Sequence, residues 1–253
     1  MQNKALIDRC QEADFPKALS SSLNCFIDAA SALRPLYPPD QLYKVDFAER
    51  CLLREVLDPD DHGSHWWHTG LHIMATGARE HPALADSFSA GLEDLSHLLE
   101  AKLGPYDTVT LREIEESTVN GICLLSELMT YPQNTFVAPN AYSLAQALFS
   151  NTAWYRAVYA GKAPVGFMML DDDADEHIYY LWRFMVAPPF QGKGFGAAAM
   201  AHLIDYVRTR PEAQALLLSY VDHESGPAEF YRSLGFTETG KVEDGEVEMS
   251  LSL

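Results

Sequence analysis

The sequence has few cysteines and few basic residues, and each shortage argues against a class of protein. The four cysteines are scattered along the chain without a C-x-x-C pair, which argues against a disulfide framework and indicates free thiols in a reducing compartment. Lysine and arginine number 18 against 36 aspartates and glutamates, giving a net charge of −18. Such an acidic chain is poorly suited to bind nucleic acid or an anionic membrane surface.

Long apolar runs and targeting signals are also missing. No stretch of 18 or more apolar residues occurs, so the sequence predicts no transmembrane helix. The first residues lack the apolar stretch and cleavage site of a signal peptide. We therefore expect a cytoplasmic protein. With 253 residues, of which 47% are apolar, the chain can form one large domain or two small ones.

Residues 1–103 have the apolar spacing of helices. Apolar side chains recur every three or four positions in four segments, at 16–33, 40–57, 64–79 and 82–103. Gly104-Pro105 marks a boundary, because glycine ends helices and proline cannot continue them. We predict a smaller all-helical domain, a bundle at 1–103. Its role is open: it could form a homodimer, cover the substrate side of a second domain or bind a regulator.

A histidine cluster that begins just before the third of these segments and continues into it has the spacing of a metal site. Its members recur at three- and four-residue intervals, at His62, His65, His68 and His72, and such spacing can ligate zinc from one helix face. However, no glutamate completes an H-E-x-x-H pattern. The two tryptophans within the cluster favour packing in a core or an interface, so we expect no metal.

Residues 108–253 alternate between strand and helix patterns, the order of an α/β fold. An acidic loop at 171–176 is expected to lead into a strand at 177–186, and Asn140 is placed to cap a helix that runs to Phe149. Strands are predicted at 108–114, 153–160, 165–170, 177–186, 215–221, 236–242 and 245–251. Helices are predicted at 115–127, 140–149 and 227–234, with another between Gly196 and Pro211.

The most informative stretch is a glycine-rich turn between a strand and a helix. Gln191, Gly194 and Gly196 spell Q-x-x-G-x-G, with a further glycine at 192. Such a turn points backbone N–H groups and the positive end of a helix at one place, which suits a pyrophosphate. A P-loop would need serine or threonine after Lys193, and a dinucleotide fingerprint would need glycine in place of Gln191. A coenzyme A pyrophosphate loop is the interpretation left.

This turn resembles the core motif [RQ]-x-x-G-x-[GA] of the GCN5-related N-acetyltransferases (GNAT). A second segment, Phe230-Tyr231-Arg232-Ser233-Leu234-Gly235-Phe236, resembles the F-Y-x-x-x-G-F helix of the same family. The resemblance covers about residues 108–253 and implies an acyl-CoA N-acyltransferase fold with a mixed, mostly antiparallel sheet. It also implies acetyl-CoA as co-substrate. The segments 136–140, 180–185 and 239–246 resemble the spermine/spermidine (diamine) acetyltransferase branch, which implies a polyamine acceptor.

The resemblance also implies roles for particular residues. Tyr231 would protonate the leaving thiolate. The backbone of a strand would bind the pantetheine arm, at Phe184, Met185 and Val186. The turn would hold the pyrophosphate, through Gln191, Gly192, Lys193, Gly194, Phe195 and Gly196.

Acetyl transfer also requires a neutral amine and a path for its proton. Deprotonating an alkyl amine with a pKa of about 10.4 costs roughly 4 to 5 kcal/mol at pH 7, and alignment alone can contribute roughly 7 to 11 kcal/mol. A base therefore needs only to relay a proton. Tyr180 and Glu115 are candidate catalytic bases, and Glu116, His177 and Glu224 are alternatives.

Carboxylates are better suited to the ammonium groups of a polyamine that do not react, because a carboxylate beside the reacting nitrogen stabilises its charged form. Asp171 and Glu176 of the acidic loop are candidates for this role, and Trp182, on the strand face of Tyr180, could line a pocket for an alkyl chain or a cation. Two alternatives stay open. The acceptor could be an amino acid, a peptide N-terminus or an aminoglycoside, or the domain could bind acyl-CoA without catalysis.

Overall fold

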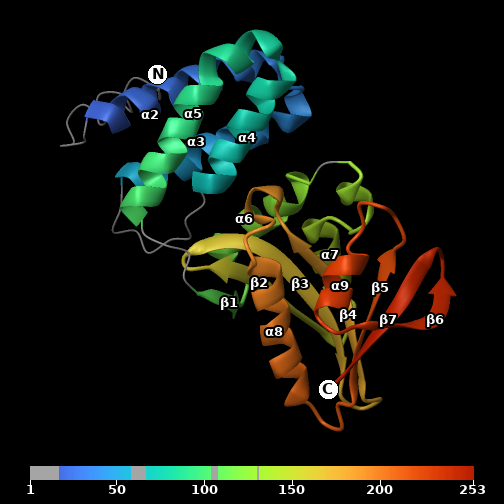
Figure 1. The fold of residues 1–253 in the computed structure, drawn as a ribbon. Helices are drawn as coiled ribbons and strands as arrows, with labels where there is room; N and C mark the ends of the chain where they lie inside the picture. The colour runs from blue at the N-terminus through green and yellow to red at the C-terminus, as the bar shows by residue number, and fades with distance from the viewer. Residues whose placement is uncertain (1–16, 58–66, 104–107, 130) are drawn as a thin grey trace. The chain divides into compact units, whose positions relative to one another are not determined.

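The computed structural model describes residues 17–57, 67–103, 108–129 and 131–253. The chain divides into two compact units, Met1–Tyr106 and Asp107–Leu253, which are drawn in Figure 1 and described separately below. Within the described ranges, no helix combines the length and the apolar character needed to cross a membrane.

The N-terminal unit is built from helices, as predicted. These are α2 (Lys17–Leu33), α3 (Leu42–Leu57), α4 (Trp67–Glu80) and α5 (Pro82–Leu103), with short 3-10 turns at Arg34–Leu36 and Pro39–Gln41. Helix α4 packs against α3 and α5, and α2 packs against α5. A Cβ on Gly70 would lie 3.0 Å from the carbonyl oxygen of Ala48, so glycine allows α3 and α4 to approach closely. Leu33, Met74 and Leu95 are fully buried between the helices.

The C-terminal unit contains a seven-stranded sheet in the order β1-β2-β3-β4-β5-β7-β6. The strands are β1 (Val109–Arg112), β2 (Ala153–Ala160), β3 (Ala163–Asp173), β4 (Ile178–Val186), β5 (Ala215–Val221), β6 (Thr237–Glu243) and β7 (Glu246–Ser252). Neighbouring strands are antiparallel except for the parallel pair β4 and β5. The predicted α/β fold class, with a mixed and mostly antiparallel sheet, is therefore confirmed.

Helices cover both faces of this sheet (Figure 1). Helix α8 (Phe195–Arg208) lies on one face, where its apolar side Met200, Leu203 and Val207 is fully buried. Helices α6 (Glu116–Glu127) and α7 (Asn140–Ala147) lie on the other, and the short α9 (Ala228–Ser233) follows β5. Strand β3 is consequently buried along its first eight residues, which fits its near-continuous apolar sequence.

Asn140 does not cap α7, contrary to the sequence-based prediction. Pro139 occupies the N-cap position and Asn140 is the first helical residue. The Asn140 side chain is fully buried, and its Nδ2 donates a hydrogen bond to the carbonyl oxygen of Ile122 at 2.7 Å. It therefore links α7 to α6 instead of satisfying the N–H groups of its own helix.

The predicted acidic loop is also shorter than expected, because β3 continues to Asp173. Asp171, Asp172 and Asp173 pair in register with Tyr180, Tyr179 and Ile178 of β4. A strand can include these carboxylates because Asp172 has partners. Its Oδ1 accepts a hydrogen bond from Arg210 Nε (2.9 Å) and its Oδ2 accepts one from the Tyr206 hydroxyl (2.6 Å).

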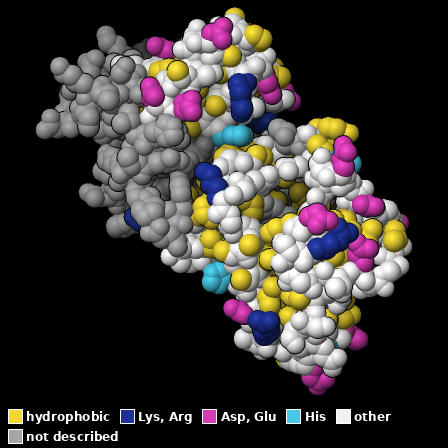
Figure 2. All heavy atoms as spheres, viewed as in Figure 1, with side chains coloured by type: hydrophobic (Ala, Val, Ile, Leu, Met, Phe, Trp, Pro, Cys, Tyr) yellow, Lys and Arg dark blue, Asp and Glu magenta, His cyan; other side chains and the backbone are white. Residues whose placement is uncertain are grey.

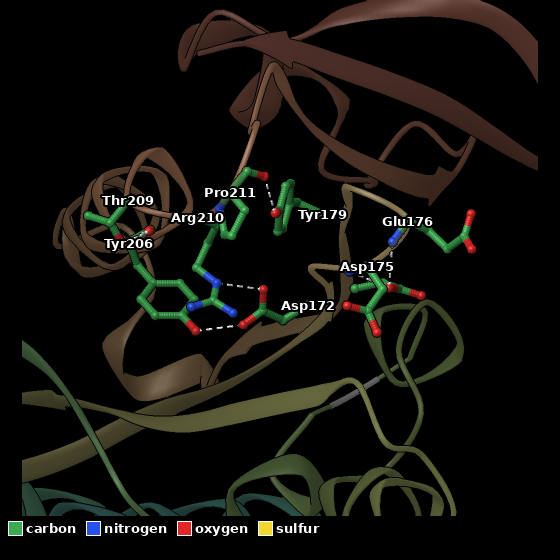
Figure 3. A network of polar contacts seen from close by, with 9 residues as sticks. Asp172, Asp175, Glu176, Tyr179, Tyr206, Thr209, Arg210 and Pro211 are labelled. Carbon is green, nitrogen blue, oxygen red and sulfur yellow. Dashed lines mark hydrogen bonds and ion pairs between the residues drawn. The ribbon is translucent and has the colours of Figure 1, made fainter.

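The contacts of Asp172 form part of a polar network drawn in Figure 3. The Tyr179 hydroxyl donates a hydrogen bond to the carbonyl oxygen of Pro211 at 2.6 Å. The Asp172 side chain is only 9% exposed. Burial and the hydrogen bond to Asp172 raise the pKa of Tyr206 to about 12. The network fastens the β3–β4 hairpin to the C-terminal end of α8 and holds the strand that leads to the glycine-rich turn.

Charged side chains are dispersed over the described surface. On the face shown in Figure 2, the lysine and arginine side chains of the C-terminal unit lie apart from one another, with acidic side chains between them. Among the described residues on this face, there is therefore no basic stripe along which a phosphate backbone could lie.

Candidate active site

A cleft opens where β4 and β5 separate. The two strands are paired only at Tyr180 with Leu217 and Leu181 with Leu218, although β4 continues to Val186 and β5 to Val221. The resulting cleft has a volume of about 1010 Å³, at the upper end of the usual range for small-molecule sites. Its walls come from 180–186 of β4, 219–221 of β5, the loop 133–139, the glycine-rich turn and the start of α9.

The glycine-rich turn ends at the N-terminus of α8. Gly192 and Gly194 have φ values of +72° and +83°, a left-handed conformation that favours glycine. A Cβ on either residue would meet no atom within 4 Å, so the backbone is open to an approaching ligand. In the described part of the chain no side chain caps α8, and its helical bonds begin with Ala198 N–H to Gly194 O. The N-terminal end of α8 is therefore a candidate anion site, through the positive end of the helix dipole and backbone N–H groups.

Gly196 lies against side chains of α9 and β4, at ordinary van der Waals distance. A Cβ on Gly196 would lie 3.4 Å from Cζ of Phe230 and 3.7 Å from Cγ2 of Val186. The Phe230 ring in turn stacks on Phe184 with centroids 6.2 Å apart. Phe184 and Val186 therefore face α8 and α9, on the side of the sheet where the glycine-rich turn lies.

The side chain of Gln191 braces the turn. Its Nε2 donates hydrogen bonds to the carbonyl oxygen of Val186 (2.8 Å) and to Oε1 of Gln133 (3.1 Å). The Lys193 side chain is exposed, the Phe195 side chain is buried, and neither residue lines the cleft. The other residues predicted to bind the cofactor do line it, namely Phe184, Met185, Val186, Gln191, Gly192, Gly194 and Gly196.

Tyr231 lies in the wall of the cleft on α9. Its side chain is buried between Phe230 and Phe236, with ring centroids at 5.2 and 5.8 Å. Burial raises the pKa of the Tyr231 phenol well above its usual value of about 10. The phenol is therefore protonated at neutral pH and can donate a hydrogen bond to a group in the cleft.

A β-bulge in β4 changes which residues share a face. Leu181 pairs with Leu170 and Arg183 with Met169, so Trp182 is the extra residue. Beyond the bulge, Arg183 Nη2 donates a hydrogen bond to Gln146 of α7 (3.3 Å), which places Arg183 on the α7 side. Before it, Tyr179 reaches the end of α8, which leaves Tyr180 on the α7 side as well. The bulge thus places Arg183 on the same face of β4 as Tyr180. Simple alternation along the strand predicted Trp182 on that face.

A carboxylate that the sequence analysis did not select enters the cleft from β7. Glu246 lines the cleft and accepts a short hydrogen bond from the hydroxyl of Ser219 on β5. Burial raises the pKa of Tyr180, and the charge of Glu246 contributes to the rise. Glu246 is the first residue of β7 and follows a turn, so no motif marks it. Only the pairing of β5 with β7 brings it beside Ser219.

The predicted acidic residues lie elsewhere. Glu115 is the N-cap residue of α6, where its N–H donates a hydrogen bond to the Thr118 hydroxyl at 3.0 Å. Asp171 lies on β3, and Glu176 is exposed in the turn that follows, where its N–H donates to Asp173 Oδ1 at 3.0 Å. None of the three lines the cleft, whereas Tyr180 and Trp182 do.

The histidine cluster lies largely outside the described residues. His62 and His65 fall in the range 58–66, and the side chain of His68 is likewise outside the description. Burial lowers the pKa of His72 to about 4, with a contribution from Arg79. His72 is therefore neutral at pH 7. The described residues include no group of three histidine, cysteine or acidic side chains that could hold a metal ion.

Comparison with known proteins identifies the family of this domain. Residues 124–236 match the model of the acetyltransferase (GNAT) family, so the C-terminal unit carries a GNAT acetyltransferase domain, and the resemblance found in its two motifs is confirmed. A search of curated protein sequences finds no match.

Solved structures with a similar arrangement have low sequence identity. An acetyltransferase from Thermus thermophilus is 14% identical, with a TM-score of 0.49 over 59% of this chain and 100% of that chain. The ribosomal-protein-S18-alanine N-acetyltransferase of Escherichia coli is 17% identical, with a TM-score of 0.45 over 57% and 94%. The spermidine N-acetyltransferase of Vibrio cholerae is 20% identical, with a TM-score of 0.44 over 57% and 93%. At these values the neighbours do not indicate a substrate.

Proposed function

We propose that the C-terminal unit is an acetyl-CoA-dependent N-acetyltransferase that acts on the primary amine of a small molecule. One observation carries the proposal: the cleft between β4 and β5 joins the anion site at the start of α8 to the phenol of Tyr231. The GNAT domain at 124–236 is consistent with this activity.

The cofactor half of the site fits the shape and charge of coenzyme A. The pyrophosphate would bind the N–H groups of the first turn of α8, in front of Gly192 and Gly194. The pantetheine amides would pair with backbone groups of β4 from 184 to 186, where β4 is no longer paired with β5. Phe184 and Val186 face this side of the sheet and would give the arm an apolar surface.

The reaction requires an amine to displace a thiol. The nitrogen attacks the thioester carbonyl, a C–N bond forms as the C–S bond breaks, the nitrogen loses a proton and the sulfur gains one. Tyr231 would donate a hydrogen bond to the sulfur as negative charge develops there. Its raised pKa makes the phenol a weaker acid than a thiol, whose usual pKa is about 8.5. Stabilisation by a hydrogen bond therefore fits Tyr231 better than complete proton transfer.

The amine half of the site is the side of the cleft that faces α7. Tyr180, Ser219 and Glu246 lie there, on β4, β5 and β7. A polyamine, the acceptor expected from the sequence, would place an ammonium group beside Glu246. Glu115, Asp171 and Glu176 remain candidates only if the acceptor extends beyond the cleft.

The proposal is tested by release of free thiol from acetyl-CoA by the full chain, with mass spectrometry of the acetylated product. The panel contains spermidine, spermine, shorter diamines, amino acids and an aminoglycoside. We expect acetyl-CoA to bind and at least one primary amine to accelerate thiol release. Binding of acetyl-CoA without turnover of any amine would instead favour a non-catalytic acyl-CoA-binding module.

A further inference from the structure

The acceptor half of the cleft contains one positive and one negative side chain. Among the described residues that line the cleft, Arg183 is the one cation and Glu246 the one carboxylate. The charge of Glu246 acts on Arg183, but the two side chains form no ion pair in the described structure. Glu246 is instead hydrogen bonded to Ser219. Both charges are therefore available to a ligand.

The guanidinium of Arg183 does not find a hydrogen-bond partner for each of its N–H groups in the described structure. Its Nη1 donates to the carbonyl oxygen of Trp182 (2.8 Å) and its Nη2 to Oε1 of Gln146 (3.3 Å), while Nε is buried without a partner in the described structure. A guanidinium has five N–H donors in a planar fork that matches a carboxylate. Burial also lowers the pKa of Arg183, although the charge of Glu246 acts in the opposite direction, as expected when the removal of water from a cation outweighs the attraction of an anion that is not in contact with it.

The position of Arg183 separates it from the cofactor half of the site. Arg183 lies on the α7 side of β4 through its contact with Gln146, whereas Phe184 and Val186 face α8 and α9. The pyrophosphate site at the start of α8 is on the latter side. The charge of Arg183 is therefore directed to the acceptor.

We infer that the acceptor is an amine that also carries a carboxylate, which binds Arg183 while the amine end of the molecule lies toward Glu246 and Ser219. This inference rests on the proposed function. An amino acid has both charges, whereas a polyamine has only positive ones and would place one of them near Arg183. The site therefore selects a zwitterionic acceptor over a polyamine.

Two pairs of compounds test the inference directly, because they differ only in the carboxylate. Lysine is compared with cadaverine, and ornithine with putrescine, by calorimetric titration of the full chain in the presence of coenzyme A. A charged hydrogen bond gained at Arg183 predicts about 10- to 150-fold tighter binding of the amino acid. Arg183→Gln should abolish this preference, and Arg183→Lys should keep part of it because the charge stays but the planar fork is lost.

Arg156 supplies a matched control on β2, which is separated from β4 by β3. It lies over Trp154 as Arg183 lies over Trp182, and its Nη1 donates to the carbonyl oxygen of Tyr155 as that of Arg183 does to Trp182. It does not line the cleft. Arg156→Gln should therefore leave the preference for the amino acids intact.

The inference and the proposed function fail in different ways. If neither amino acid binds more tightly than its diamine, or if Arg183→Gln keeps the preference, the inference is overturned whatever the enzyme turns over. If the amino acids bind preferentially but no amine of the wider panel releases thiol from acetyl-CoA, binding at Arg183 is supported and the proposed function is overturned.

Discussion

The hydroxyl of Tyr231 is the part of the proposed site whose removal can be interpreted most directly. Tyr231→Phe deletes one oxygen and keeps the ring, which packs against Phe230 and Phe236. Loss of a hydrogen bond to a developing thiolate corresponds to about 1.5 to 3 kcal/mol. At about 1.36 kcal/mol per factor of ten, kcat should fall by about 10- to 150-fold.

The pH dependence of kcat tests whether the Tyr231 phenol stays protonated and keeps donating its hydrogen bond. Because burial raises its pKa, the phenol stays protonated as the pH increases through the range where an ordinary tyrosine ionises, near 10. Wild-type kcat should therefore not decline between pH 8 and 10 through ionisation of Tyr231. The KM for acetyl-CoA should change little in the variant, since the hydroxyl acts when charge develops on the sulfur.

The assay is steady-state thiol release across this pH range, with acetyl-CoA binding measured separately. Tyr179→Phe is the matched control: it removes the hydroxyl of another buried tyrosine, which bonds Pro211 and lies outside the cleft. It should cost stability without a comparable loss of kcat. Unchanged kcat in Tyr231→Phe, with coenzyme A still bound, would refute the role of Tyr231.

Three further predictions concern the anion site, the polar network and the N-terminal unit. Gly194→Ala forces an alanine to φ +83° at the start of α8 and should raise the KM for acetyl-CoA. Gly240→Ala imposes the same strain at φ +86° outside the cleft and should leave this KM unchanged. Equal effects of the two variants on the KM would show that backbone strain alone is responsible. Asp172→Ala leaves Arg210 and Tyr206 without their partner and should lower the free energy of unfolding by about 3 kcal/mol, as measured by urea denaturation. In the control variant Asp175→Ala, the substituted side chain is exposed and the loss should be less than about 0.5 kcal/mol. For His72, the folded-state pKa of about 4 lies below the usual value of 6.5, so the stability that the neutral imidazole contributes is full above pH 6.5 and is lost as the pH falls toward 4. Over this interval the free energy of unfolding of the wild type should fall by up to about 3 kcal/mol more than that of His72→Gln. Parallel losses in the two proteins would refute the burial of a neutral imidazole.

The cofactor half of the site could be predicted from sequence because its parts are local. The glycine-rich turn joins a strand to a helix within a few residues, and backbone geometry at Gly192 and Gly194 follows from residue type. The Phe230-Tyr231 segment is likewise contained in one short helix. In such segments, sequence spacing determines spatial proximity.

Two local predictions failed where tertiary contacts outweighed propensity. Asn140 has the sequence preference of an N-cap, yet a buried hydrogen bond to Ile122 uses its amide. Asp171, Asp172 and Asp173 have the composition of a loop, yet pairing with β4 and the contacts of Asp172 with Arg210 and Tyr206 extend the strand. In both cases a side chain bonds a partner at least 18 residues away, Ile122 for Asn140 and Tyr206 for Asp172.

The acceptor half depends on pairings that no spacing rule reports. Ser219 and Glu246 meet only because β7 inserts between β5 and β6. The bulge at Trp182 adds one residue to β4, and a shift of one residue exchanges the two faces of a strand. Alternation then predicts an aromatic side chain beside Tyr180, whereas the folded strand presents Arg183. One inserted residue thus brings a cation suited to a carboxylate to the face of Tyr180, in a wall that still contains Trp182. The identity of the acceptor therefore depends on the register of β4, which the Arg183 variants test directly.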